Sequence, residues 1–182
     1  MRKIIILFSL LYFFILGNTA QKIDCEKNID SISVSKGDLA QYKEAYNYIL
    51  FDSINQGKDI YVSDIIVDMD RFYFKSDVKN DSTLAHIINS LTKYYWFNDF
   101  SSPEIKTLFK GQNSRAESIL FFSLIEKNTL RADLFLNRKN KNEFRYNWLS
   151  NYNVGEIYAY LFFFDEMGKI KHIYRTKMIY EI

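Results

Sequence analysis

The chain has 182 residues, with 24 Lys and Arg against 22 Asp and Glu, so its formal net charge is +2. This length fits one domain that buries about two-thirds of the surface of its unfolded chain. The small charge excess does not favour nucleic acid or an anionic membrane as partner, because both select strongly basic surfaces. Cys25 is the only cysteine, so no internal disulfide forms and stability depends on packing.

The first twenty residues have the three-part pattern of a secretory signal peptide. Arg2 and Lys3 form a basic start, residues 4–16 form an apolar stretch, and residues 17–20 supply the small residues before a cleavage site. A helix of that apolar stretch spans about 20 Å of a hydrocarbon core about 30 Å thick, so a membrane anchor is disfavoured. We expect cleavage after Ala20 and a secreted or periplasmic protein, with an uncleaved anchor or a buried N-terminal strand as the alternatives.

The mature chain is predicted to begin with a loosely ordered arm, residues 21–33, followed by a single α+β domain over residues 34–182. The signal peptide carries the whole basic excess, so the mature chain is close to neutral. Cys25 lies in the arm, but Asp24 and Lys22 precede it where a lipid-attachment site needs small and aliphatic residues. We therefore predict no stable membrane anchor after cleavage.

The first part of the domain is predicted to contain a helix and two strands. Ser35-Lys36-Gly37-Asp38 resembles a capping box, and apolar residues at helical spacing follow until the chain reaches Gly57, which suits a helix end. Residues 60–67 are β-branched and apolar enough for a strand. Residues 71–74 are predicted to form a second, short strand.

Two more helices are predicted in the middle of the chain. After a start at Asn80-Asp81-Ser82, apolar residues share one helical face: Leu84, Ile87, Ile88, Leu91 and Tyr95. The only proline, Pro103, follows Ser102, and this order is typical of a capped helix start with proline at its first position. That short helix is expected to end at Gly111.

From Ser118 onward the pattern changes to strands. Residues 119–125 and 130–136 are predicted to form a hairpin with a turn at Asn128, and in its second strand Leu130, Ala132, Leu134 and Leu136 alternate with Arg131, Asp133 and Phe135. Residues 143–149 are predicted to form a further strand. Residues 157–164 are apolar on both strand faces, which predicts a central strand covered on both sides.

The last strand is predicted over residues 169–182, after a turn at residues 165–168. One of its faces is predicted to be the core face, with Ile170, His172, Tyr174, Thr176, Met178, Tyr180 and Ile182. Its other face has the basic residues Lys169, Lys171, Arg175 and Lys177. We interpret these charges as a solvated face that discourages edge pairing, in preference to an anion site.

This order of a helix, a strand pair, helices and an antiparallel meander resembles that of the NTF2-like superfamily. In that superfamily a curved sheet wraps a helix to form a cone-shaped pocket. The resemblance implies N-terminal helices packed on a C-terminal antiparallel sheet. It does not imply an activity, because this superfamily includes both enzymes and non-catalytic modules.

Few residues suggest catalysis or metal binding. The chain lacks a nucleophile motif, and its isolated glycines form no phosphate loop, so we predict no cofactor and no metal. His86 and His172 are interpreted as core or rim histidines. The alternative function is a small hydrolase or isomerase with its acid/base site in a cone-like pocket, using Asp64, Asp68, Asp70 or His172.

Aromatic residues in two predicted loops suggest a binding role. Residues 94–100 and 144–148 place Trp and Tyr beside Asn, Asp and Arg, as sites for sugars or peptides do, because flat rings stack while polar groups orient the ligand. The predicted ligand-binding residues are Trp96, Asp99, Tyr146 and Trp148. The chain is therefore predicted to be an exported, non-enzymatic domain that binds a small molecule, glycan or protein.

Overall fold

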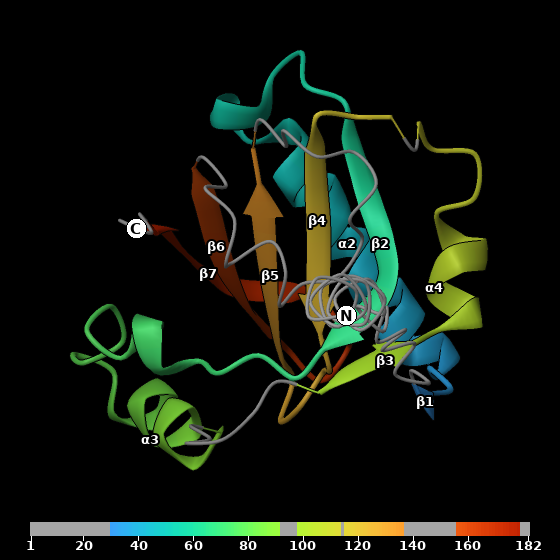
Figure 1. Cartoon of the computed structure of the whole chain (residues 1–182). Helices are drawn as coiled ribbons and strands as arrows, with labels where there is room; N and C mark the ends of the chain where they lie inside the picture. Colours follow the sequence, from blue (N-terminus) through green and yellow to red (C-terminus); the bar gives the residue numbers. More distant parts are fainter. Residues whose placement is uncertain (1–29, 92–97, 114, 137–155, 179–182) are drawn as a thin grey trace, which may run out of the picture.

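The computed structural model describes residues 30–91, 98–113, 115–136 and 156–178 (Figure 1). The strands of this part are β1 (Asp30–Ser31), β2 (Ile60–Val67), β3 (Asp99–Ser101), β4 (Ser118–Ser123), β5 (Thr129–Phe135), β6 (Ile157–Phe164) and β7 (Ile170–Met178). Its helices are α2 (Lys36–Phe51), α3 (Ser82–Leu91) and α4 (Pro103–Leu108), with short 3-10 turns η1 (Ser53–Asn55) and η2 (Phe72–Phe74). The predicted signal peptide lies outside the described residues.

The strands form one sheet of seven in the order β1-β3-β2-β4-β5-β6-β7. Only the neighbours β1 and β3, and β2 and β4, run parallel. The remaining neighbours are antiparallel, and β4 to β7 form a meander of consecutive strands. The fold is therefore α+β with a mostly antiparallel sheet. Asp30 and Ser31, at the end of the predicted arm, pair with Phe100 and Ser101.

Helix α2 begins at its predicted cap but ends before its predicted stop. The Ser35 Oγ accepts a hydrogen bond of 3.1 Å from the Asp38 backbone N–H, as expected of a capping box. At the other end, Asp52 takes an extended backbone, and its side chain accepts from the Ile54 N–H, which starts η1. This side-chain competition for backbone donors ends the helix at Phe51, ahead of Gly57.

The predicted strand over residues 71–74 is wrong, because η2 occupies this position. The Asp70 Oδ1 accepts from the Phe72 backbone N–H at 2.9 Å, and this local bond turns the chain after β2. Phe74 N–H then donates to the Arg71 carbonyl, closing the 3-10 turn. A run of aromatic residues thus folds as a turn when the preceding aspartate supplies an acceptor.

The caps of α3 and α4 match their predicted helix starts. The Asp81 Oδ1 accepts from the backbone N–H groups of Thr83 and Leu84, both at 3.0 Å. The Ser102 Oγ accepts from the Ile105 N–H at 3.3 Å, and Pro103 occupies the start of the helix. Short-range capping bonds therefore decide both starts.

Both predicted hairpin turns are present. Lys127 and Asn128 have φ of 50° and 54°, the left-handed backbone that a two-residue turn between β4 and β5 needs. Gly168, with φ of 76°, supplies the same freedom between β6 and β7. The Asp165 carboxylate also accepts from two backbone N–H groups of that turn. The predicted strand 143–149 lies outside the described residues.

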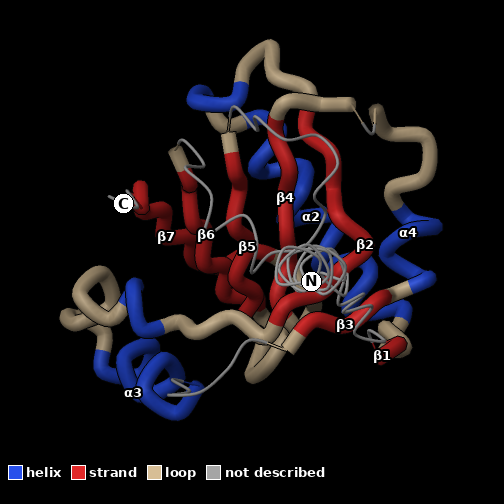
Figure 2. The backbone as a smooth tube through the Cα atoms, in the orientation of Figure 1, coloured by secondary structure: helices blue, strands red, loops and turns tan. Residues whose placement is uncertain are grey.

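The sheet has a hydrophobic cluster on each face. Figure 2 shows α2 crossing the sheet beside β2 and β4. The first cluster joins Tyr42, Ala45 and Ile49 of α2 to apolar side chains of β2, β4, β5 and β6. The second cluster joins Leu84 and Ile88 of α3, with apolar residues of the β2 to α3 connection, to the opposite face. Strand β6 contributes to both clusters, so the predicted burial of both its faces is confirmed.

A β-bulge changes the predicted faces of β7. Phe163 lies opposite His172, whereas Phe164 lies opposite Ile170, so Lys171 is an extra residue in the pairing. Ile170 consequently packs against the first cluster together with Ile173, and not on the face of His172 as predicted. A bulge cannot be read from an alternating sequence pattern. A prediction based on alternation alone therefore assigns the residues before the bulge to the wrong face of the sheet.

Candidate binding site

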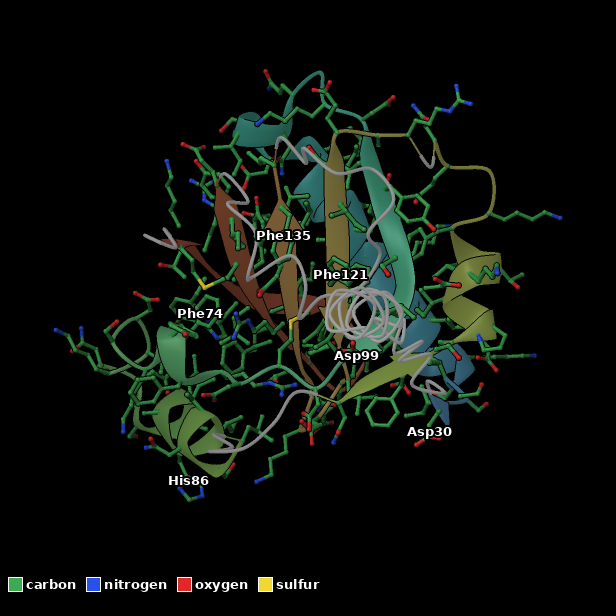
Figure 3. All side chains as sticks on the ribbon, in the orientation of Figure 1. Asp30, Phe74, His86, Asp99, Phe121 and Phe135 are labelled. Carbon is green, nitrogen blue, oxygen red and sulfur yellow. The ribbon has the colours of Figure 1, made fainter. Side chains whose placement is uncertain are left out.

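Three of the four predicted ligand-binding residues, Trp96, Tyr146 and Trp148, lie outside the described residues. Asp99 is described, and it is the first residue of β3, half-buried and opposite Val67 of β2 (Figure 3). The structure therefore places one member of the predicted set on the sheet. Its arrangement with the other three stays a prediction.

The three candidate aspartates of the alternative enzyme have separate environments. Asp64 lies 3.7 Å from Lys106 of α4. Asp70 accepts the Phe72 N–H that starts η2. Asp68, between them in the chain, is half-buried at the end of β2. Among the described residues, no group of three or more His, Cys, Asp and Glu side chains is placed to hold a metal ion.

The two histidines lie on different elements. His86 is exposed on α3, and Figure 3 shows it at the outer side of the helix. His172 is half-buried on β7, opposite Phe163 and thus on the face of the second cluster. Asp64, by contrast, contacts α4, whose Ile105 belongs to the first cluster. The sheet therefore separates His172 from Asp64.

The basic residues of β7 are mostly paired with carboxylates of neighbouring elements. Lys169 lies 3.1 Å from Glu44, and Arg175 lies 2.6 Å from Asp52, both on the α2 side. Lys177 pairs with Glu156 next to β6. These ion pairs neutralise three of the four predicted basic residues, and Lys171 is exposed.

Asp52 is the best-connected carboxylate of that side. Partial burial alone raises the pKa of Asp52, but hydrogen bonds from Arg175, the Ile54 N–H and the Tyr160 hydroxyl together lower this pKa below its ordinary value. The Arg175 contact is bidentate, with distances of 2.6 and 2.7 Å. Asp52 thus remains ionised and ties the end of α2 to β7.

A second polar network is buried near the β4 to β5 hairpin, and it contains a fully buried arginine, Arg71. Its guanidinium donates to the carbonyl oxygens of Met69 at 2.7 Å and Leu124 at 2.8 Å, and to the Ser123 Oγ at 3.2 Å. It also lies 3.0 Å from a carboxylate oxygen of Glu126. Burial lowers the pKa of Arg71, and the carboxylate of Glu126 opposes that shift.

Arg131 of β5 is a second buried arginine in the described part of the chain, with 1% of its surface exposed. It makes a bidentate pair with Asp133, which is 0% exposed, at 2.8 Å from Nε and 2.7 Å from Nη2. Its Nη1 donates to the Asp70 carbonyl oxygen. The Ser123 Oγ accepts from the Arg131 backbone N–H at 2.9 Å and so connects the two arginines.

These arginines fix the position of an exposed pair of rings. They hold the carbonyl oxygens of Met69 and Asp70, which precede Arg71 and η2 in the chain. Phe72 and Tyr73 are the first two residues of η2, and they are 50% and 51% exposed; we call them the aromatic turn. Each ring also lies near a cation: Tyr73 is 5.3 Å from the Arg131 guanidinium and Phe72 is 5.9 Å from the Lys75 Nζ.

The aromatic turn has the physical properties of a binding surface. Rings that are half-exposed on a fixed backbone bury a large apolar area when a partner covers them, and they lose little conformational entropy in doing so. Phe74, labelled in Figure 3, is fully buried in the second cluster and anchors the same turn from below. Sequence reasoning missed this surface, because it assigned residues 71–74 to a strand.

Compared with known protein families, curated proteins and solved structures, the chain gives no match. Within the part that the structure describes, no helix has the length and apolar character to cross a membrane.

Proposed function

We propose that this protein is an exported, non-enzymatic binding domain that contacts its partner through the aromatic turn. The observation that supports this proposal best is the fixation of Phe72 and Tyr73 by two buried arginines. Burying an arginine costs several kcal/mol in desolvation unless hydrogen bonds and a counter-charge satisfy its guanidinium. Two buried arginines are therefore not expected at a loop that has no role. Presentation of two rings to a partner accounts for that cost.

Replacing both Phe72 and Tyr73 by serine tests the role of the aromatic turn. The purified chain is screened against immobilised glycans and linear peptides, and the strongest probe is then titrated. We expect the double variant to bind that probe at least about tenfold more weakly, the size of a typical loss at an aromatic hot spot. The matched control is Met167→Ser, because Met167 is another exposed apolar side chain, in the turn between β6 and β7, with 83% exposure.

Two results contradict the aromatic-turn proposal. One is an unchanged Kd for the double variant, with a circular-dichroism spectrum equal to that of the parent chain. The other is an equal loss in Met167→Ser, which indicates non-specific adhesion to exposed apolar side chains. Absence of binding to every immobilised glycan and peptide excludes both of these ligand classes.

Export is the part of the proposal that rests on the sequence alone, on the basic start, the apolar stretch and the small residues before Gln21. We expect the protein recovered outside the cytoplasm of an expressing cell to begin at Gln21. Intact-mass spectrometry measures this directly, and a cleavage-site variant, Ala20→Arg, serves as the matched control that retains the leader. Recovery of a chain that still begins with Met1, or of lipid on Cys25, contradicts the prediction.

We also propose the finer architecture, an NTF2-like cone in which the helices pack on the meander. Its support is α2, whose buried residues share one cluster with side chains of four strands. We also propose that residues 34–182 form a single domain with this architecture. A crystal structure of the mature chain tests both, because a flat sheet without a cavity under α2 contradicts the cone.

A further inference from the structure

Strand β7 ends the sheet on one side, and Figures 1 and 2 show it at that edge. Within the described residues it pairs with β6 alone. An edge strand directs the N–H and C=O groups of alternate residues outward, where another strand can pair with them. β7 runs over nine residues, and the seven that follow the bulge at Lys171, residues 172–178, continue without interruption.

Helix α2 contacts this edge strand. Glu44 accepts from the Ile170 backbone N–H at 3.2 Å, and Asp52 binds Arg175, so one flank of α2 lies along β7. Tyr48 and Phe51 follow Glu44 at helical spacings of four and seven and therefore share that flank. They are 43% and 79% exposed, and we call them the α2 shelf.

An added strand joins these two features. A strand paired to β7 lies about 4.8 Å beyond it, and alternate side chains of that strand point toward the side of the sheet that α2 occupies. Those side chains cover the α2 shelf, which the seven described strands leave exposed. We propose that the β7 edge binds an extended segment of a partner polypeptide by strand addition, with apolar residues on the α2 shelf and a carboxylate opposite Lys171.

The charges of β7 favour such a partner over a second copy of this chain. Within the described part, Lys171 forms no ion pair, whereas Lys169, Arg175 and Lys177 each have a carboxylate partner. In an antiparallel pair of two β7 strands, the registers that keep most of the strand paired set Lys171 opposite Arg175 or Lys177, or Arg175 opposite itself. Like charges directly opposite each other disfavour pairing.

The proposal does not rest on the aromatic turn and is tested separately from it. The full chain is used to select from a random linear peptide library displayed on phage, and the strongest peptide is synthesised and titrated by fluorescence anisotropy. We expect the selected peptides to alternate apolar and polar residues, with acidic residues enriched. The variants are Phe51→Ser for the α2 shelf and Lys171→Glu for the edge, and the matched control is Lys110→Glu, which reverses the charge of an exposed lysine after α4.

We expect Phe51→Ser to weaken binding about tenfold, as loss of an aromatic anchor does. Lys171→Glu is expected to weaken the binding of the selected acidic peptide. It is expected to strengthen the binding of a second peptide, in which lysine replaces each acidic residue. Lys110→Glu is expected to leave the Kd of both peptides unchanged. Failure to select any peptide, equal binding by all three variants, or a dimer in size-exclusion chromatography that Lys171→Glu alters overturns the proposal.

Discussion

Replacement of Asp133 by asparagine lowers the free energy of unfolding by about 3–5 kcal/mol, because it leaves the Arg131 guanidinium buried without its counter-charge. Arg131 and Asp133 are 1% and 0% exposed, so water does not take over the lost interaction. Asparagine also replaces one of the two carboxylate acceptors, at 2.8 and 2.7 Å, by an amide donor. The variant thus loses a buried bidentate charge pair and places two like hydrogen-bond donors in contact.

Urea unfolding followed by circular dichroism measures this loss as a shift of the transition midpoint. The matched control is Asp77→Asn, which neutralises an exposed carboxylate after η2 and is expected to change stability by no more than about 0.5 kcal/mol. A double variant, Arg131→Met with Asp133→Leu, removes both charges and is expected to recover most of the lost stability. An unchanged midpoint for Asp133→Asn contradicts the prediction.

The elements that the sequence predicted well are those set by local bonds. The cap at Ser35, the serine and proline at the start of α4, and the turn at Asn128 each depend on residues within four positions of one another. Such bonds form in the same way in any fold, so the residue types suffice to predict them. The burial of β6 on both faces was equally readable from its unbroken apolar run.

The features that sequence reasoning missed depend on contacts between distant segments. Arg131 and Asp133 alternate with leucines, a pattern that usually indicates a solvent face, yet residues of the β2 to α3 connection cover them. Arg71 is buried for the same reason, through bonds to the end of β4. Charged residues two apart on one strand face, with opposite signs, are the only local hint of such a pair.

The candidate binding site shows the same division. The predicted site was selected from loops rich in Trp and Tyr, and composition indeed identifies rings that suit binding. It does not show which rings remain exposed, because exposure depends on what packs over them. Phe72 and Tyr73 are exposed while the adjacent Phe74 is fully buried, and this difference arises from the path of η2 above the sheet.

Phe162 is expected to be the most costly apolar side chain to truncate in the central strand. It is fully buried in β6, and its ring lies 5.8 Å from Tyr48, 6.1 Å from Tyr160 and 6.3 Å from Phe164. Phe162→Ala removes these contacts and leaves a cavity between α2 and the sheet. We expect a loss of about 3–5 kcal/mol in the free energy of unfolding.

Phe51→Ala provides the matched control, because it makes the same chemical change in the helix that covers Phe162. With Phe51 79% exposed, we expect its truncation to change stability by no more than about 0.5 kcal/mol. Both variants lose a phenyl ring, but only Phe162 is buried. The difference between their urea midpoints therefore measures the effect of burial. If both variants shift the midpoint equally, Phe51 packs against the protein in solution, and the open α2 shelf that strand addition requires does not exist.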